Sequence, residues 1–134
     1  SPGRKRLLGE TRWDLSCEFP VPPPGSETRP ENSVLLAAHS TPEAAGRGMF
    51  DSLCQLDIES GKTSHIDLGP HTFPSEVVHA GGHLLSLAYD AESHTSFVAV
   101  VDASRFEEGT VAKMHFEHHV PLGFHGVWVG AERA

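Results

Sequence analysis

Residues 84–101, LLSLAYDAESHTSFVAVV, carry the strongest strand signal in the chain. It contains two nearly continuous apolar runs, residues 84–89 and 97–101, separated by a polar turn over residues 90–95. Unbroken apolar character in short runs is typical of strands that are covered on both faces. This stretch therefore predicts a β-hairpin whose strands are covered on both sides.

Further strands are predicted on either side of this hairpin. Residues 34–39, 53–58 and 63–68 are apolar or β-prone, and the Gly-containing loop 59–62 joins the last two into a second hairpin. Residues 111–120 alternate with period two, so Ala112, Met114 and Phe116 are expected to be buried and Lys113, His115 and Glu117 to be solvated. Only single helical turns are expected, within 41–47 and 104–108, and the Pro-rich stretch 20–30 is expected to be a loop. The fold class predicted is all-β.

Composition narrows the class of protein. The 134 residues are 38% apolar with 13 Gly, which is ordinary for a globular domain and unlike a coiled coil or a disordered tail. The formal net charge of −8 argues against nucleic acid as a partner. Two Cys cannot form a disulfide framework and lack zinc-ligand spacing, so we expect a reduced, cytoplasmic chain. No apolar run approaches the length of a membrane-spanning helix.

A weak internal similarity points to a repeat. The segment Asp57-Ile58-Glu59-Ser60 is similar to Asp90-Ala91-Glu92-Ser93, and the two start 33 residues apart. This spacing is somewhat below the roughly 40–45 residues of a propeller blade, and chance similarity accounts for it equally well. A chain of this length would hold only two or three blades, which leaves sheet edges and one apolar face open.

Histidine is the obvious candidate for chemistry, with ten residues in the chain. The cluster His115, His118 and His119 does not place three ligands on one strand face, so these side chains are interpreted as solvated. His125 differs because its surroundings, residues 120–129, are almost wholly apolar. An imidazole in such a setting requires a hydrogen bond or a metal, so it is either a core histidine bonded to a carbonyl or a metal ligand.

Two carboxylates lie in similar settings. Glu18 and Glu76 each lie in an apolar stretch close to a proline. A buried Glu is rare unless it is paired, and the simpler alternative is that both lie at loop surfaces. No side chain is singled out as a general acid, a general base or a nucleophile.

The segment PLGFHG, residues 121–126, resembles the C-terminal signature of the carotenoid cleavage oxygenases. The similarity extends backwards in the family's order through Val111-Ala112-Lys113, Val101-Asp102-Ala103 and residues 84–90. Arg12-Trp13, Glu18-Phe19-Pro20 and residues 56–61 also look like family segments, so the resemblance covers roughly residues 12–129. Glu76 departs from the pattern in being followed by Val77, where the family commonly has Pro.

The resemblance implies a fold, a metal and a reaction. The family fold is a seven-bladed β-propeller, so residues 1–134 would form its last two or three blades, a single C-terminal fragment with no separate second domain. The family holds Fe(II) with four histidines oriented by outer glutamates. By position, His125 resembles the last iron ligand, and Glu18 and Glu76 resemble two of the outer glutamates.

The implied reaction is oxidative cleavage of a carbon–carbon double bond. The substrates would be O2 and an apolar polyene or stilbene-like molecule, and iron and O2 would carry the chemistry. The remaining ligands would come from the propeller's earlier blades, so the isolated chain is expected to be inactive. The alternatives are a non-catalytic β module and a different His-rich metalloprotein such as a cupin, which the lack of a His-x-His pair disfavours.

Overall fold

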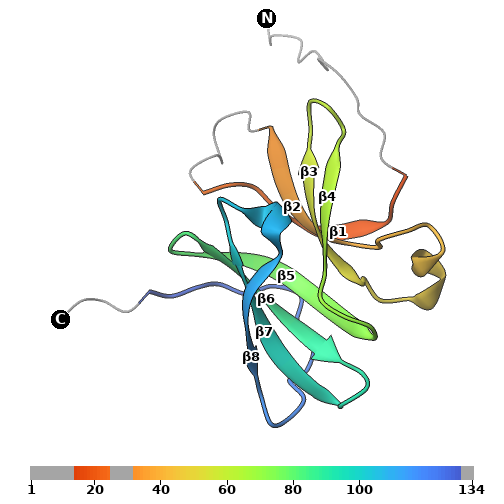
Figure 1. The fold of residues 1–134 in the computed structure, drawn as a ribbon, viewed down its shortest axis with the longest axis vertical. Coiled ribbons are helices and arrows are strands. Elements are labelled where there is room, and N and C mark those ends of the chain that lie inside the picture. Colours follow the sequence, from red (N-terminus) through yellow and green to blue (C-terminus); the bar gives the residue numbers. More distant parts are fainter. Residues whose placement is uncertain (1–13, 25–31, 131–134) are drawn as a thin grey trace, which may run out of the picture.

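The computed structural model describes residues 14–24 and 32–130 and shows two four-stranded antiparallel sheets (Figure 1). The first sheet contains β1 (Cys17–Val21), β2 (Ser33–Ala38), β3 (Ser52–Asp57) and β4 (Thr63–Asp67). The second contains β5 (Thr72–Ala80), β6 (His83–Asp90), β7 (Thr95–Asp102) and β8 (Thr110–His115). In each sheet the strands lie in chain order, which is the meander of a propeller blade. The expected all-β class is confirmed.

Helical structure in the described ranges is limited to two short 3₁₀ turns, η1 (Ala44–Arg47) and η2 (Phe106–Glu108). They lie where single turns were expected, and Thr41 Oγ1 accepts the Ala44 N–H at 3.2 Å ahead of η1. None of the described helices is long and apolar enough to cross a membrane. Most of the predicted loop 20–30, and the family-like pair Arg12-Trp13, lie outside the described residues.

The main core lies between the two sheets. Leu53 of β3 and Leu68, just after β4, meet Val77, Phe97 and Val101 of the second sheet, each 2% exposed or less. The pleat selects these residues because alternate side chains of each strand point to one face. The core therefore holds the two sheets face to face, with the edge strands β1 and β5 close to each other (Figure 1).

The predicted cover on both faces is present in the first sheet and incomplete in the second. In β2, Leu35 faces the main core while Leu36 and Ala38 form a second buried cluster with Cys54 on the opposite face. In residues 84–88 and 97–101 every second residue is buried, while Leu85, Leu87, Val98 and Val100 on the outer face are half-buried. The prediction for residues 84–101 was therefore wrong for this outer face, because unbroken apolar character does not reveal how much of each face is covered.

The strand at 110–115 differs from its prediction in both length and facing. It ends at His115, five residues before the expected end, and Met114 is 51% and Phe116 37% exposed. Lys113 and His115 lie toward the core side instead: the Lys113 ammonium donates to the Leu68 carbonyl and lies 4.9 Å from the Phe97 ring centroid. Inward-pointing charged side chains on an edge strand discourage pairing with other chains. A strand is present, but Val111 to His115 are all exposed, so the prediction of one buried face was wrong.

Two strands, β1 and β5, were not predicted. Each contains a proline, Pro20 or Pro74, and each has a register shift beside it, between Glu18 and Val21 and between Pro74 and Val77. Proline argues against a strand because it cannot donate a hydrogen bond to the ladder. It is tolerated at edge strands and bulges, and both β1 and β5 are edge strands. Glu18 and Glu76 therefore both lie on strands beside bulges, which removes the alternative that they lie in surface loops.

The weak internal repeat has a local explanation. Asp57 accepts from the Ser60 N–H and hydroxyl at 2.7 Å each, and the Asp90 carboxylate caps Ser93 in the same way. However, the first turn joins the third and fourth strands of its sheet, and the second joins the second and third. The similarity of these segments therefore reflects shared turn chemistry. The repeated unit is the four-stranded sheet itself, and the starts of corresponding strands lie 43 residues apart for β3 and β7 and 55 apart for β1 and β5.

Candidate metal centre

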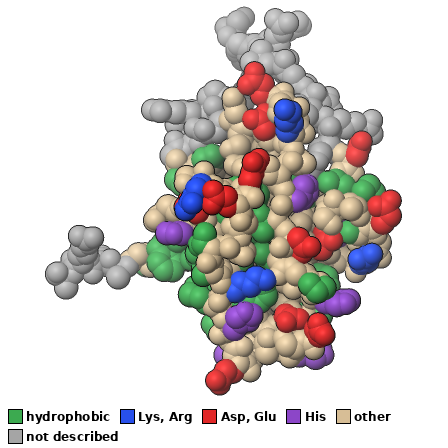
Figure 2. Space-filling model, in the orientation of Figure 1, with side chains coloured by type: hydrophobic (Ala, Val, Ile, Leu, Met, Phe, Trp, Pro, Cys, Tyr) green, Lys and Arg blue, Asp and Glu red, His purple; other side chains and the backbone are tan. Residues whose placement is uncertain are grey.

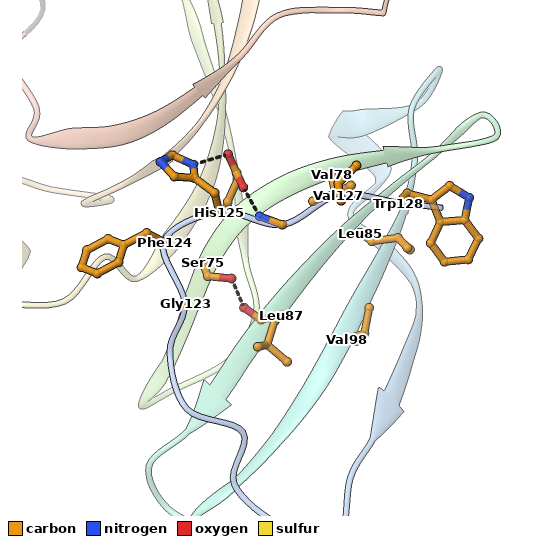
Figure 3. Close-up of a pocket in the computed structure, with 12 residues that line it drawn as sticks. Ser75, Val78, Leu85, Leu87, Val98, Gly123, Phe124, His125, Val127 and Trp128 are labelled. Carbon is orange, nitrogen blue, oxygen red and sulfur yellow. Dashed lines mark hydrogen bonds and ion pairs between the residues drawn. The ribbon is translucent and has the colours of Figure 1, made fainter. Parts of the chain in front are cut away.

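His125 lies on the irregular segment that follows β8 and crosses the outer face of the second sheet at β5 and β6 (Figure 3). Its side chain is 77% exposed. Pro121 cannot donate a ladder hydrogen bond, so the chain leaves the sheet before the histidine. An exposed ring bonded to a carboxylate is not the core histidine that was one of the two alternatives from the sequence.

Glu76 holds this histidine and its neighbour together. The Glu76 Oε1 atom lies 3.1 Å from His125 Nδ1, and Oε2 accepts the Gly126 N–H at 2.7 Å (Figure 3). An ionised carboxylate only accepts, so the proton of a neutral imidazole resides on Nδ1. The Nε2 lone pair is then available to a metal, and Nε2 bonds to none of the described residues. The carboxylate thereby sets the tautomer that ligation requires.

The bulge in β5 explains why Glu76 reaches this position. The register shift between Pro74 and Val77 leaves Ser75 and Glu76 outside the regular ladder. Ser75 is held there by its hydroxyl, which donates to the Leu87 carbonyl at 2.8 Å (Figure 3). Bulges re-aim side chains, and here the glutamate is directed at a residue 49 positions further along the chain.

The Phe19 ring contacts the imidazole of His125. Its ring lies edge-on to His125, with centroids 5.9 Å apart, and also edge-on to Phe50 at 6.4 Å. Phe19 has φ 57°, an unfavourable backbone conformation for a bulky residue. The bulge in β1 places it there, and backbone outliers of this kind are concentrated at functional sites. No pattern in the sequence indicated this role for Phe19.

Glu18 is not brought into contact with His125. Its side chain is exposed, and it makes no hydrogen bond or ion pair with any described residue. It lines a neighbouring hollow of about 340 Å³ together with Leu122 and Phe124 of the His125 segment. The structure thus joins Glu76 to His125 and places Glu18 beside the same segment.

The surroundings of the Glu76–His125 pair are apolar. A shallow pocket of about 230 Å³ is lined by the half-buried face of the second sheet, including Val78, Leu87 and Val98, and by Phe124 and Trp128 (Figure 3). Several side chains of the segment are open to solvent, with Phe124 77% and Val127 83% exposed. This surface is suited to contact with apolar groups that the described residues do not supply.

Carboxylates and thiols elsewhere in the described residues are further potential donors. On the described part of the face shown in Figure 2, acidic side chains are spread out, with a few Lys and Arg between them. Burial raises the pKa of the Cys54 thiol to about 12, so it remains protonated at neutral pH and is a poor ligand. Burial also raises the pKa of Cys17.

The donor chemistry fits one position of a metal site. His125 Nε2 is a neutral nitrogen donor of the kind that iron accepts, and its orienting carboxylate is in place. Among the described residues, no group of three or more His, Cys, Asp or Glu could hold a metal ion. A site built on His125 therefore requires donors from outside the described ranges.

An all-β meander bearing a carboxylate-oriented histidine is the arrangement expected of a carotenoid oxygenase propeller. The family model described as retinal pigment epithelial membrane protein matches residues 1–130. The chain is 32% identical to the apocarotenoid-15,15'-oxygenase of Synechocystis over 84% of its own length and 24% of that protein. It is 31% identical to carotenoid 9,10(9',10')-cleavage dioxygenase 1 of Pisum sativum over 56% of its length and 16% of that enzyme.

Solved structures give the same result. A crystal structure of an ACO/RPE65 chimera matches 86% of this chain with a TM-score of 0.76 and 28% identity, over 26% of its own chain. Cobalt-substituted Synechocystis ACO matches with a TM-score of 0.74 and 29% identity, over 86% of this chain and 26% of its own. The chain belongs to the retinal pigment epithelial membrane protein family of carotenoid oxygenases, and it spans about a quarter of the length of these relatives. The family expected from PLGFHG and the partial propeller are both confirmed.

Proposed function

We propose that this chain is the C-terminal part of an Fe(II)-dependent dioxygenase that cleaves a carbon–carbon double bond of a carotenoid, apocarotenoid or stilbene-like substrate. The observation that carries the proposal is the Glu76 carboxylate on His125 Nδ1, because it leaves Nε2 free to bind a metal. The names of the relatives, an apocarotenoid oxygenase and carotenoid cleavage dioxygenases, support the substrate class.

In this proposal His125 supplies one iron ligand and Glu76 is the outer glutamate that orients it. Glu18 is proposed as a second outer glutamate, serving a histidine that lies outside this chain, because it borders the same segment without touching His125. A bound ferrous ion would supply the activation of O2. The chain's own part is to hold one imidazole in the ligating tautomer and to surround it with apolar side chains that exclude water.

The remaining donors are proposed to come from earlier blades of the same propeller, so that residues 1–134 form one fragment of a larger domain. The open apolar surfaces support this arrangement: Met114 is 51% and Trp128 54% exposed in the described part of the chain. Exposed apolar area of this extent is typical of a surface that packs against a partner. A cytoplasmic location remains a prediction from the chain's two free cysteines.

The test compares the 134-residue chain with a longer polypeptide that supplies the earlier blades. Apocarotenoid bleaching and bound iron are measured for both. We expect the isolated chain to bind negligible iron and to leave the substrate intact. We expect the longer protein to bind iron and to bleach the substrate, and His125→Ala to abolish both. Bleaching by the isolated chain, lost in its His125→Ala variant, would overturn the proposed inactivity. A longer protein without iron or activity would favour a non-catalytic β module.

A further inference from the structure

A buried serine fastens the segment that carries His125. Ser96 of β7 is 0% exposed, and its backbone continues the β8 pairing beyond His115: Ser96 O accepts from Phe116 N at 2.8 Å, and Ser96 N donates to His118 O at 3.1 Å. Its hydroxyl extends this pairing further, because Oγ accepts the Val120 N–H at 3.0 Å and lies 3.5 Å from the Val120 carbonyl. One residue thus holds three points along residues 116–120.

The hydroxyl contact cannot easily be replaced by backbone pairing. Pro121 has no N–H and restricts Val120 to an extended conformation, so a regular ladder cannot continue past this point. Beyond it, residues 122–124 make no hydrogen bond to any other described residue. The next attachment is the Glu76 carboxylate, which binds His125 and Gly126. Besides the edge-on contact with Phe19, the position of His125 therefore depends on two hydrogen-bonded attachments, Ser96 on one side and Glu76 on the other.

The second attachment is weak on its own. The hydrogen bond from the imidazole contributes little net stability in water, because the His125 side chain is 77% exposed. How often the Glu76 contacts form then depends on the length of the unattached segment that precedes His125. With Val120 held, four residues, 121–124, are free; with Val120 released, the free stretch grows to six, 119–124. Because closure probability falls with about the three-halves power of loop length, the Glu76 contacts should form about twofold less often.

We propose that Ser96 is a positioning residue for His125, acting through Val120 to hold the imidazole and Gly126 against Glu76. The ligand role of His125 rests on the proposed function, while the fastening itself can be measured without a metal. The readout is the exchange rate of the Gly126 amide in the metal-free 134-residue chain, followed by NMR. This amide is donated to Glu76, far along the chain from the substitution, so a purely local packing role for Ser96 would not change it.

In Ser96→Ala we expect faster exchange at Val120 and, by about twofold or more, at Gly126, with amides of β6 unchanged. Ser96→Thr keeps the hydroxyl and should restore both rates. Ser52→Ala is the matched control, because Ser52 is 1% exposed and its hydroxyl also bonds a backbone carbonyl, that of Ala38, in the other sheet. If Ser96→Ala does not fold, Val120→Pro removes the same N–H donor from outside the core.

A Gly126 rate that stays at the wild-type value in Ser96→Ala, or in Val120→Pro, while Val120 or its neighbours loosen would overturn the proposal. Equal acceleration in Ser52→Ala would do the same, because the effect would then be one of general stability. If the longer protein proves to bind no iron, the proposed function fails, but this exchange result still decides whether Ser96 positions His125.

Discussion

Replacing the orienting carboxylate by its amide isolates the chemistry of Glu76 with almost no change of shape. Glu76 accepts two donors, His125 Nδ1 at 3.1 Å and Gly126 N at 2.7 Å. Glutamine has one acceptor oxygen and one donor NH2. If the oxygen faces Gly126, the NH2 faces Nδ1, and the ring must move its proton to Nε2, which then cannot bind a metal. If the oxygen faces the ring, the NH2 opposes the Gly126 N–H.

Either arrangement loses about one hydrogen bond to a charged group, worth roughly 1.5–3 kcal/mol. Since 1.4 kcal/mol is a factor of ten, we expect Glu76→Gln to weaken iron binding about 10- to 100-fold. The assay is the iron dissociation constant of the longer polypeptide, measured by competition with a chelator. Glu92→Gln is the control, because Glu92 lies in the exposed β6–β7 turn. Iron affinity in Glu76→Gln that matches the Glu92→Gln control would refute the assignment of Glu76.

Three other predictions concern the scaffold. Hydrogen bonds from Ser104 lower the pKa of Asp102 to about 2. Because the folded pKa lies below the unfolded one, the stability that Asp102 contributes should be lost as pH falls from about 4 to about 2. Asp102→Asn should therefore reduce the pH dependence of the melting temperature over that window. Leu53→Ala should cost about 2–5 kcal/mol of unfolding free energy in urea titrations, because the side chain is 1% exposed; a loss below 1 kcal/mol would contradict its place in the core. Lys113→Val should lower stability by about 1 kcal/mol through the lost Phe97 contact and should increase aggregation measured by light scattering, whereas Lys62→Val in an exposed turn should do neither.

The strands that could be predicted from the sequence are those with a continuous apolar, β-prone run of residues. Residues 84–89 and 97–101 are apolar and β-prone along their whole length, and both became strands of the second sheet. Pro20 and Pro74 hid β1 and β5, because their acceptability depends on an edge position and a bulge that only the assembled sheet defines. The alternation at 111–116 indicated the strand β8 but not its facing, which is decided by contacts of Lys113 with Leu68 and Phe97.

The candidate site was accessible from the sequence only through its resemblance to a family. His125 and Glu76 are 49 residues apart, and neither periodicity nor composition links them. The resemblance proposed both residues, and the fold brings them within hydrogen-bond distance. The Gly126 N–H on the same carboxylate, the Phe19 ring beside the imidazole and the Ser96 fastening were not foreseen, because each depends on a bulge or on chain geometry after Pro121.

The proposed function requires the imidazole of His125 to be a metal ligand, and the iron content of two histidine variants checks this. The iron content per chain of the longer polypeptide is measured for the wild type, for His125→Ala and for His83→Ala, which alters an exposed histidine at the start of β6. We predict that His83→Ala retains the wild-type iron content and His125→Ala loses it while still folding. If His125→Ala retains the full iron content, His125 is not an iron ligand.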